Sequence, residues 1–292
     1  MSAPAAPDRR AVKRAFSRAA ASYDAHAVLQ REVAGRLAEH LEGIRIEPTR
    51  VLDLGCGTGG SFAALGERYP RARLTGLDLA RPMLEQARAR VPWWRRKLGL
   101  AAAPALVCAD AERLPLAAGS HELVFSSLAL QWCDPARVFA EVARVLPVEG
   151  LFLFATLGPD TLKELRAAFA AADDAPHVNT FIDMHDLGDA MVHAGFADPV
   201  MEMEVLTLEY GSVERVVEDL RGIGAANALP GRPQGLGGRE RWKRVEAAYE
   251  KHRRDGALPA TYEVVYGHAW KARPRAAADG RPIVQFHPRR LG

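Results

Sequence analysis

The residues of this sequence best suited to chemistry lie in one stretch, RVLDLGCGTGG at positions 50–60. An acid, Asp53, stands within a short apolar run, and glycines follow at 55, 57, 59 and 60 before a helical pattern of apolar residues. This order predicts a buried strand, a tight turn and the start of a helix. Glycines at such a turn permit positive φ and let a ligand approach the backbone closely. Open α/β sheets bind their ligands at this strand end.

The charge of Asp53 limits the kind of ligand that fits. Gly55, Gly57 and Gly60 satisfy the dinucleotide pattern G-x-G-x-x-G. However, a carboxylate just before the first glycine would repel a pyrophosphate and would suit an ammonium group. A second acid, Asp78, ends the strand predicted at 73–77. It lies close to the spacing of about 20 residues at which a carboxylate receives the hydroxyls of a ribose. The two acids together favour a nucleoside cofactor over a dinucleotide.

Strands and helices alternate around these acids. Further strands are predicted at 105–108, 122–126, 150–156, 200–208 and 261–270, and helices at 9–23, 27–41, 135–146, 159–172 and 184–194. Ligand residues at consecutive strand ends specify a doubly wound α/β sheet. We divide the chain into an N-terminal helical lid (1–45), a Rossmann-like core (46–211), an inserted helical cap (212–260), a closing strand of the core (261–271) and a tail (272–292).

Composition excludes several classes of protein. The 292 residues carry a net charge of +3, which does not by itself indicate nucleic acid. The three cysteines are widely spaced, so we expect neither a disulfide framework nor a metal site. The N-terminus has no apolar region of a signal peptide, and no apolar stretch approaches the length of a membrane span. We therefore expect a cytoplasmic protein without a membrane span. The sequence does not indicate the oligomeric state.

The run D-L-G-C-G-T-G at 53–59 resembles motif I of the class I S-adenosylmethionine (SAM) methyltransferases. The resemblance implies a mostly parallel sheet with an antiparallel last strand. It also implies that Asp53 helps to hold the methionine end of the cofactor and that Gly55, Gly57 and Gly59 pass beneath it. The other implied cofactor residues are Met83, which packs on the adenine, Asp110 at the adenine amine with Ala111 beside it, and Ser126 and Ser127 in the methyl-donor pocket.

A narrower resemblance covers residues 11–271. The segments AFSRAAASYDAHAVLQREVA, LALQWCDP, LRGIGAANAL and LPATYEVVYGHAWK together resemble the malonyl-[acyl-carrier protein] O-methyltransferases of biotin synthesis. The resemblance implies methylation of the free carboxylate of malonyl-acyl carrier protein or malonyl-CoA to its methyl ester. A carboxylate is ionised at neutral pH, so this reaction needs alignment and exclusion of water rather than a general base.

Three residues are candidates for substrate positioning. A bidentate arginine suits a carboxylate, so Arg221 or Arg166 could hold the malonyl group, although each could equally be a solvated surface residue. Tyr23 lies in a polar joint between two predicted helices. It would close over the donor methyl or would be an ordinary boundary aromatic.

An acidic carrier protein would dock on a basic face. The candidate runs are Arg95–Lys97, Arg239–Arg244 and Lys251–Arg254. The first of these lies in an insertion, PWWRRKLGLAAAP at 92–104, which could equally be a loop whose tryptophans pack locally.

Three rival functions remain on the sequence alone. The segments LGPDTLKELR and HDLGDAMVHAGF resemble the complex I assembly factors, which implies SAM-supported hydroxylation of a partner arginine. Methylation of a small quinone or lipid is the second rival. The third is SAM binding without catalysis, against which the intact Asp53, Asp78 and Asp110 argue.

Overall fold

The computed structural model describes residues 7–90, 103–225, 227–228 and 238–273. The basic run Arg95–Lys97, almost all of the insertion at 92–104, and the tail beyond residue 273 lie outside the described residues.

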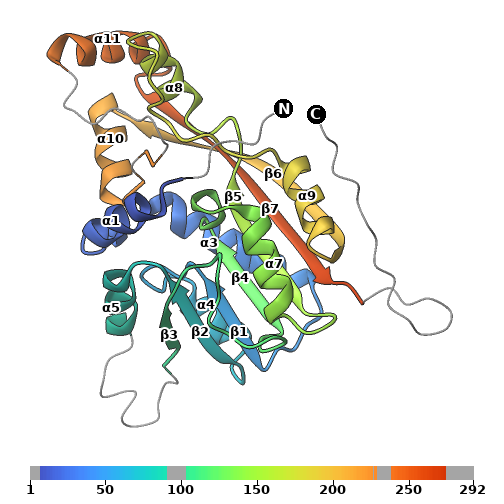
Figure 1. Ribbon diagram of the computed structural model, residues 1–292. Helices are drawn as coiled ribbons and strands as arrows, with labels where there is room; N and C mark the ends of the chain where they lie inside the picture. Colours follow the sequence, from blue (N-terminus) through green and yellow to red (C-terminus); the bar gives the residue numbers. More distant parts are fainter. Residues whose placement is uncertain (1–6, 91–102, 226, 229–237, 274–292) are drawn as a thin grey trace.

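A seven-stranded sheet forms the centre of the molecule, with the strand order β3-β2-β1-β4-β5-β7-β6 (Figure 1). All neighbouring pairs from β3 to β5 are parallel, and β7 is antiparallel to both β5 and β6. The prediction of a doubly wound sheet whose last strand is antiparallel is confirmed. The strands are β1 (Arg50–Leu54), β2 (Arg73–Asp78), β3 (Ala105–Cys108), β4 (Leu123–Ser127), β5 (Leu151–Leu157), β6 (Phe196–Tyr210) and β7 (Leu258–Lys271).

The helices connect the strands and cover both faces of the sheet. Three of them begin with an acidic N-cap, Asp8 before α1, Asp134 before α7 and Asp183 before α9, and these side chains satisfy backbone amides that would otherwise lack partners. The helices are α1 (Arg9–Ala19), α2 (Tyr23–His26), α3 (Val28–His40), α4 (Phe62–Arg68), α5 (Arg81–Arg90), α7 (Pro135–Val145), α8 (Lys163–Ala170), α9 (Met184–His193), α10 (Val213–Gly222) and α11 (Arg239–Glu250).

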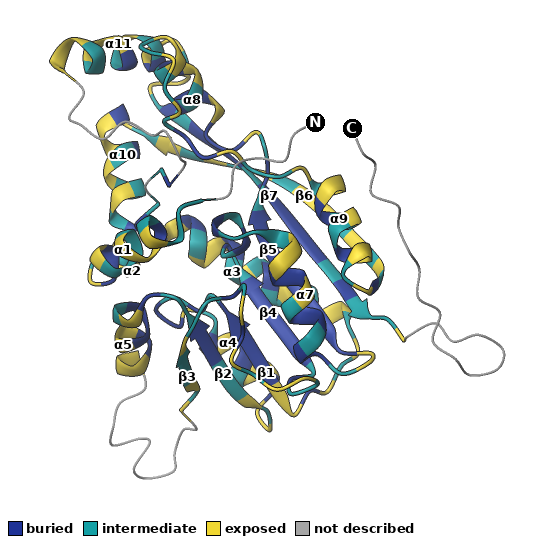
Figure 2. Ribbon diagram, in the orientation of Figure 1, coloured by how far each residue is buried: buried dark blue, intermediate teal, exposed yellow. Residues whose placement is uncertain are grey.

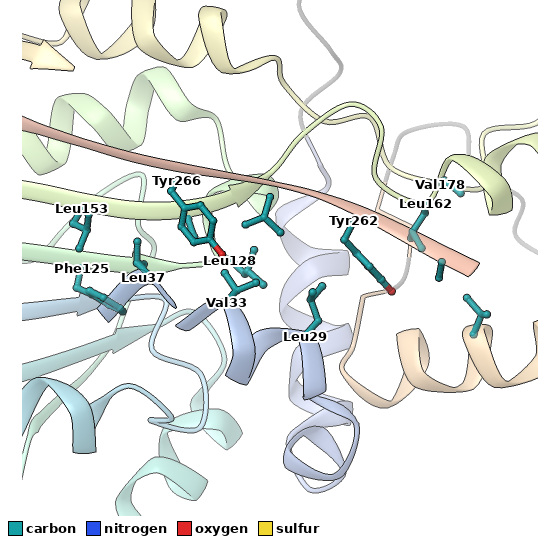
Figure 3. Close-up of a cluster of buried hydrophobic side chains, with 14 of the residues drawn as sticks. Leu29, Val33, Leu37, Phe125, Leu128, Leu153, Leu162, Val178, Tyr262 and Tyr266 are labelled. Atoms are coloured by element: carbon teal, nitrogen blue, oxygen red, sulfur yellow. The ribbon is translucent and has the colours of Figure 1, made fainter. Parts of the chain in front are cut away.

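Alternating side chains of the central strands divide the core into two layers. On one face, Phe125 of β4 and Leu153 of β5 pack against Val33 and Leu37 of α3 (Figure 3). On the other face, Phe152 and its neighbours pack against α7 and α9. Figure 2 shows these central strands as the most buried part of the chain. Their nearly unbroken apolar sequence follows from this two-sided burial.

Helix α3 is part of the core, although the sequence analysis placed it in the lid. Val33 and Leu37 are fully buried against the sheet. Only α1 and α2 remain as elements that lie over the strand ends rather than against a face of the sheet (Figure 1).

The two final strands are longer than predicted. Strand β6 covers 196–210 rather than 200–208, and β7 begins at Leu258 rather than at Thr261. Strand β5 pairs with β7 only from Val264 to Trp270, whereas β6 pairs with β7 as far as Leu258. The rest of the pair therefore continues beyond the sheet as a two-stranded ribbon. Helices α8, α10 and α11 gather around this ribbon (Figure 1).

The burial of α3 leads to a prediction on stability. Replacing Leu37 by Ala removes a fully buried side chain and should lower the free energy of unfolding by about 2–4 kcal/mol. Val28→Ala on the same helix is the matched control, because this side chain is 49% exposed, and its effect should stay within about 0.5 kcal/mol. Urea unfolding measures both. Equal, small losses would show that α3 is a detachable lid element.

Candidate active site

Three cavities meet at the carboxyl ends of β1, β2 and β4, and Tyr23 lines all of them. The strand-end cavity is bounded by Arg9, Phe16, Gly55, Gly57, Asp78, Met83, Ala111, Ser127 and Trp132, among others. The glycine-turn cavity is bounded by Asp24, Gln30, Asp53, Gly57, Thr58, Gly60, Arg90 and Ser127, among others. The cap cavity is bounded by Phe16, Gln131, Leu162, His177, Asn179, Leu220 and Tyr262, among others. The shared lining residues make one continuous site.

The turn after β1 is held in a shape that only glycine allows easily. Gly55 and Gly57 have φ of 77° and 52°, in the left-handed region. A Cβ on Gly55 would lie 2.3 Å from the Cβ of Ala129, whereas a Cβ on Gly57 would have nothing within 4 Å and would extend into the space that a ligand needs. The amide of Gly55 donates to the Leu77 carbonyl at 2.7 Å, which fixes the turn to β2.

Two of the predicted cofactor residues, Gly59 and Ser126, are not among the described lining residues of the three cavities. A Cβ on Gly59 would lie 2.6 Å from the ring of Phe62, so this glycine makes room for a core side chain, and Gly60 lines the cavity in its place. The hydroxyl of Ser126 is fully buried and donates to the Leu54 carbonyl at 2.9 Å. Ser127, the next residue, points to the opposite side and lines two cavities.

Asp53 is a buried acid with an unsatisfied oxygen. Burial raises its pKa to about 8, and the nearby charge of Asp78 adds to the rise. Among the described residues, Asp53 Oδ2, Ser127 Oγ and Gln30 Oε1 have no hydrogen-bond partner. All three residues line the glycine-turn cavity. Buried oxygens without partners are costly, so this arrangement fits a bound group that donates several hydrogen bonds, as an ammonium does.

Asp78 stands at the border between β2 and the strand-end cavity. Its Oδ2 accepts from the Gly57 amide at 3.0 Å, and its Oδ1 accepts from the Ala80 amide at 2.7 Å. These bonds orient the carboxylate while leaving lone pairs that can accept from a ligand's hydroxyls. Met83 and Ala111 line the same cavity. Burial raises the pKa of Asp78, and the two backbone amides oppose that rise.

Asp110 is paired with a cation that the sequence analysis missed. The guanidinium of Arg9 forms a bidentate contact with the Asp110 carboxylate, with Nε 3.1 Å from Oδ2. It also donates to the Trp132 carbonyl at 2.8 Å. Arg9, rather than Asp110, lines the strand-end cavity. Its position among other cations at the start of a helix carries no sequence signal that separates it from a surface residue.

A second set of contacts ties α2 to the glycine turn. Thr58 donates through Oγ1 to Asp24 Oδ1 at 2.7 Å, and Arg90 of α5 approaches Asp24 Oδ2 at 2.6 Å. Arg90 also donates to the Thr58 carbonyl at 2.5 Å. Helices α1 and α2 are therefore held over the cavities by two separate ion pairs, at Asp110 and at Asp24.

Neither predicted substrate arginine reaches the cap cavity. Arg166 donates to the carbonyls of Pro159 and Thr161 at 3.0 and 3.1 Å. Arg221 is exposed on α10, and its neighbours Leu220 and Ile223 line the cavity instead. No lysine or arginine stands in the cavity wall as far as the described residues define it. Its polar groups include Tyr23, Gln30, Gln131 and Asn179.

Tyr23 supplies a hydroxyl where the three cavities join. Burial raises its pKa, and the carboxylates of Asp78 and Asp24 raise it further. The hydroxyl therefore stays protonated near neutral pH. Tyr23 can donate a hydrogen bond to a ligand at this point, but it cannot serve as a general base.

This sheet order, the glycine turn and the acids at the ends of β1 and β2 define a class I SAM-dependent methyltransferase, whose cofactor is SAM. The family described as "Methyltransferase domain" matches residues 52–154. Among solved structures, the YcgJ protein from Bacillus subtilis has the same fold. Its TM-score is 0.58 at 18% sequence identity, with 83% of this chain and 99% of that chain covered.

Curated relatives define the family within this class. A malonyl-[acyl-carrier protein] O-methyltransferase from Laribacter hongkongensis is 59% identical over 286 residues, which cover 96% of each chain. One from Gallionella capsiferriformans is 54% identical, with 95% of this chain and 96% of the relative covered. The chain belongs to the family of malonyl-[acyl-carrier protein] O-methyltransferases. Within the described part of the chain, no helix is long and apolar enough to cross a membrane.

Replacing Asp53 by Asn should reveal the cost of burying this acid. An aspartate in the unfolded chain has a pKa of about 3.9, whereas burial raises the pKa of Asp53 to about 8 in the folded protein. Between these values the folded protein retains a proton that the unfolded chain has released, so its stability without cofactor falls as pH rises. Asp53→Asn should therefore be more stable than the wild type, by a margin that grows from about pH 4 to about pH 8.

Thermal unfolding over this pH range measures the margin, with Asp186→Asn on the exposed side of α9 as the control. Curves for the wild type and Asp53→Asn that stay parallel across the range would contradict the prediction. The same variant should bind SAM more weakly in a calorimeter, because it lacks the carboxylate that we expect to face the cofactor's ammonium group.

Arg9→Gln should weaken SAM binding without touching the core. The variant loses the bidentate contact that holds α1 over the strand-end cavity. We expect a rise of roughly tenfold in the SAM dissociation constant, which corresponds to about 1.4 kcal/mol. The control is Arg81→Gln, which removes an exposed cation from α5. A dissociation constant shared by the wild type and Arg9→Gln would show that α1 does not enclose the cofactor.

Proposed function

We propose that this protein transfers the methyl group of SAM to the free carboxylate of malonyl-acyl carrier protein, or of malonyl-CoA, and forms the methyl ester at an early step of biotin synthesis. The observation that carries the proposal is the near full-length identity to relatives with this name. The names of these relatives give no support to the rival functions, hydroxylation of a partner arginine and methylation of a quinone or lipid. The three free cysteines suit the reducing cytoplasm as its compartment.

The cofactor residues follow from the three cavities. Asp53, with Gln30 and Ser127, would hold the methionine ammonium, because their oxygens lack partners in one cavity. Asp78 would receive the ribose hydroxyls. The remaining contacts come from Gly55 and Gly57, which let the cofactor pass close to the backbone, and from Met83 and Ala111, which would enclose the adenine. Asp110, predicted at the adenine amine, would act mainly by holding Arg9.

The acceptor carboxylate would enter from the cap cavity. Apolar side chains such as Phe16, Leu128 and Leu162 form much of this cavity and exclude water. Desolvation strengthens every remaining electrostatic interaction, including attraction between the carboxylate and a sulfonium. When bound, SAM supplies a methyl group on a sulfonium sulfur, and the group passes to an ionised oxygen with no proton to remove.

Neutral donors would orient the acceptor in place of the predicted arginine. The Tyr23 hydroxyl remains protonated, and the amides of Gln131 and Asn179 stand in the same wall. Such donors fix the direction of a carboxylate without neutralising it. A strong cation would stabilise the ground-state carboxylate and lower its nucleophilicity, so a cavity without one favours attack.

Mass spectrometry tests the reaction directly. Malonyl carrier protein incubated with the purified enzyme and SAM should gain the mass of one methylene unit, and an esterase should remove it. Acetyl carrier protein is the matched control, since it has the same thioester without a free carboxylate, and it should gain nothing. A malonyl carrier protein that keeps its mass, or an acetyl carrier protein that gains, would overturn the proposed function.

A further inference from the structure

Helix α1 has one outward surface that is entirely basic. Its sequence, RRAVKRAFSRA, contains no acidic residue. Arg10, Lys13, Arg14 and Arg18 are exposed along this helix. Within residues 7–90, 103–225 and the shorter described segments, none of these four side chains forms an ion pair. A row of like charges without counter-charges on the same helix repels itself, so a partner that supplies negative charge would relieve this repulsion.

Of the seven cations in the runs Arg239–Arg244 and Lys251–Arg254, three are paired with acids of this chain among the described residues. On or beside α11, Arg241 lies 3.1 Å from Asp173, and Lys243 lies 3.0 Å from Glu240. Arg253 lies 2.6 Å from Glu250. Among the described residues, none of the four cations of α1 is paired in this way, which favours α1 over these two runs; the run Arg95–Lys97 lies outside the described residues.

The inward surface of α1 is a wall of the active site. Arg9 and Val12 line the strand-end cavity, and Phe16 lines both that cavity and the cap cavity. Phe16 also meets Trp132 edge to face, with ring centroids 5.3 Å apart. A helix with its side chains is about 10 Å thick. A partner on the outer surface would therefore stand one helix away from the place where the acceptor must arrive.

We propose that Arg10, Lys13, Arg14 and Arg18 form the docking surface for the acidic carrier protein that presents the malonyl thioester; this rests on the proposed function. Opposite charges over such a surface raise the rate of encounter and set the orientation of the carrier. Affinity from outside the cavity complements a cap cavity that has no lysine or arginine among its described lining residues. Docking on α1 also favours the position in which Arg9 stays on Asp110 and the cofactor stays enclosed.

The test replaces all four cations by Gln and compares two substrates. For malonyl carrier protein, kcat/KM should fall roughly tenfold or more, mainly through KM, and its dependence on salt should flatten. For malonyl-pantetheine, which has the same reactive end without a protein, kcat/KM should not change. The control variant removes four exposed cations elsewhere, Arg81, Arg215, Lys243 and Lys251, and should behave as the wild type with both substrates.

A binding measurement separates this proposal from the proposed function. Carrier protein with its pantetheine arm but no malonyl group should bind the wild type and the control variant in a calorimeter, and should bind the α1 variant at least about tenfold more weakly. Equal binding to all three proteins would overturn the docking surface even where methylation is found. A loss of kcat/KM that is the same for carrier protein and for malonyl-pantetheine would also overturn it.

Discussion

The arrangement of the site depends on one unfavourable fact, the burial of the Asp53 carboxylate with an oxygen that this chain does not satisfy. The acid cannot turn to water, because α3 covers its face of the sheet and the glycine turn closes the end of β1. Its neighbour Asp78 lies close enough to raise its pKa further. The raised pKa keeps Asp53 protonated near neutral pH when no ligand is bound, and binding of a cation with several donors would stabilise its ionised form.

The glycine turn and the two ion pairs of α1 and α2 are consequences of that requirement. A ligand that satisfies Asp53 must pass close to the backbone, which demands Gly55 and Gly57. Excluding water from the ligand would strengthen its electrostatic interaction with Asp53. Helices α1 and α2 would exclude this water, and their contacts through Arg9 and Arg90 hold them over the cavities. Both ion pairs, Arg9 with Asp110 and Arg90 with Asp24, join elements that are far apart in the chain. Enclosure of the cofactor would therefore depend on a fully formed sheet.

Sequence reasoning found the parts of the site that lie at strand ends and missed those that arrive from elsewhere. Asp53 and Asp78 follow apolar runs, so strand periodicity places them at one edge of the sheet. Gly59 and Ser126 share that neighbourhood, but the side on which each residue faces depends on a single φ angle and on the alternation of the strand. Arg9 resembles its four basic neighbours until the helix is placed, and the absence of lysine and arginine from the described lining of the cap cavity is a property of packing that no motif encodes.

The ribbon formed by the outer parts of β6 and β7 has a further meaning for how this scaffold can change. Tyr262 belongs to the part of β7 that extends beyond its pairing with β5 (Figure 3). Its side chain lines the cap cavity. In the proposed arrangement the cofactor lies at strand ends of the sheet, whereas the cap cavity also receives Tyr262 from the ribbon and Leu165 and Leu220 from the helices around it. Specificity for the acceptor and specificity for the cofactor would thus depend partly on different segments of one chain. During evolution, changes in the length or the side chains of the ribbon could adapt the enzyme to another acid while the residues of the cofactor site stay the same.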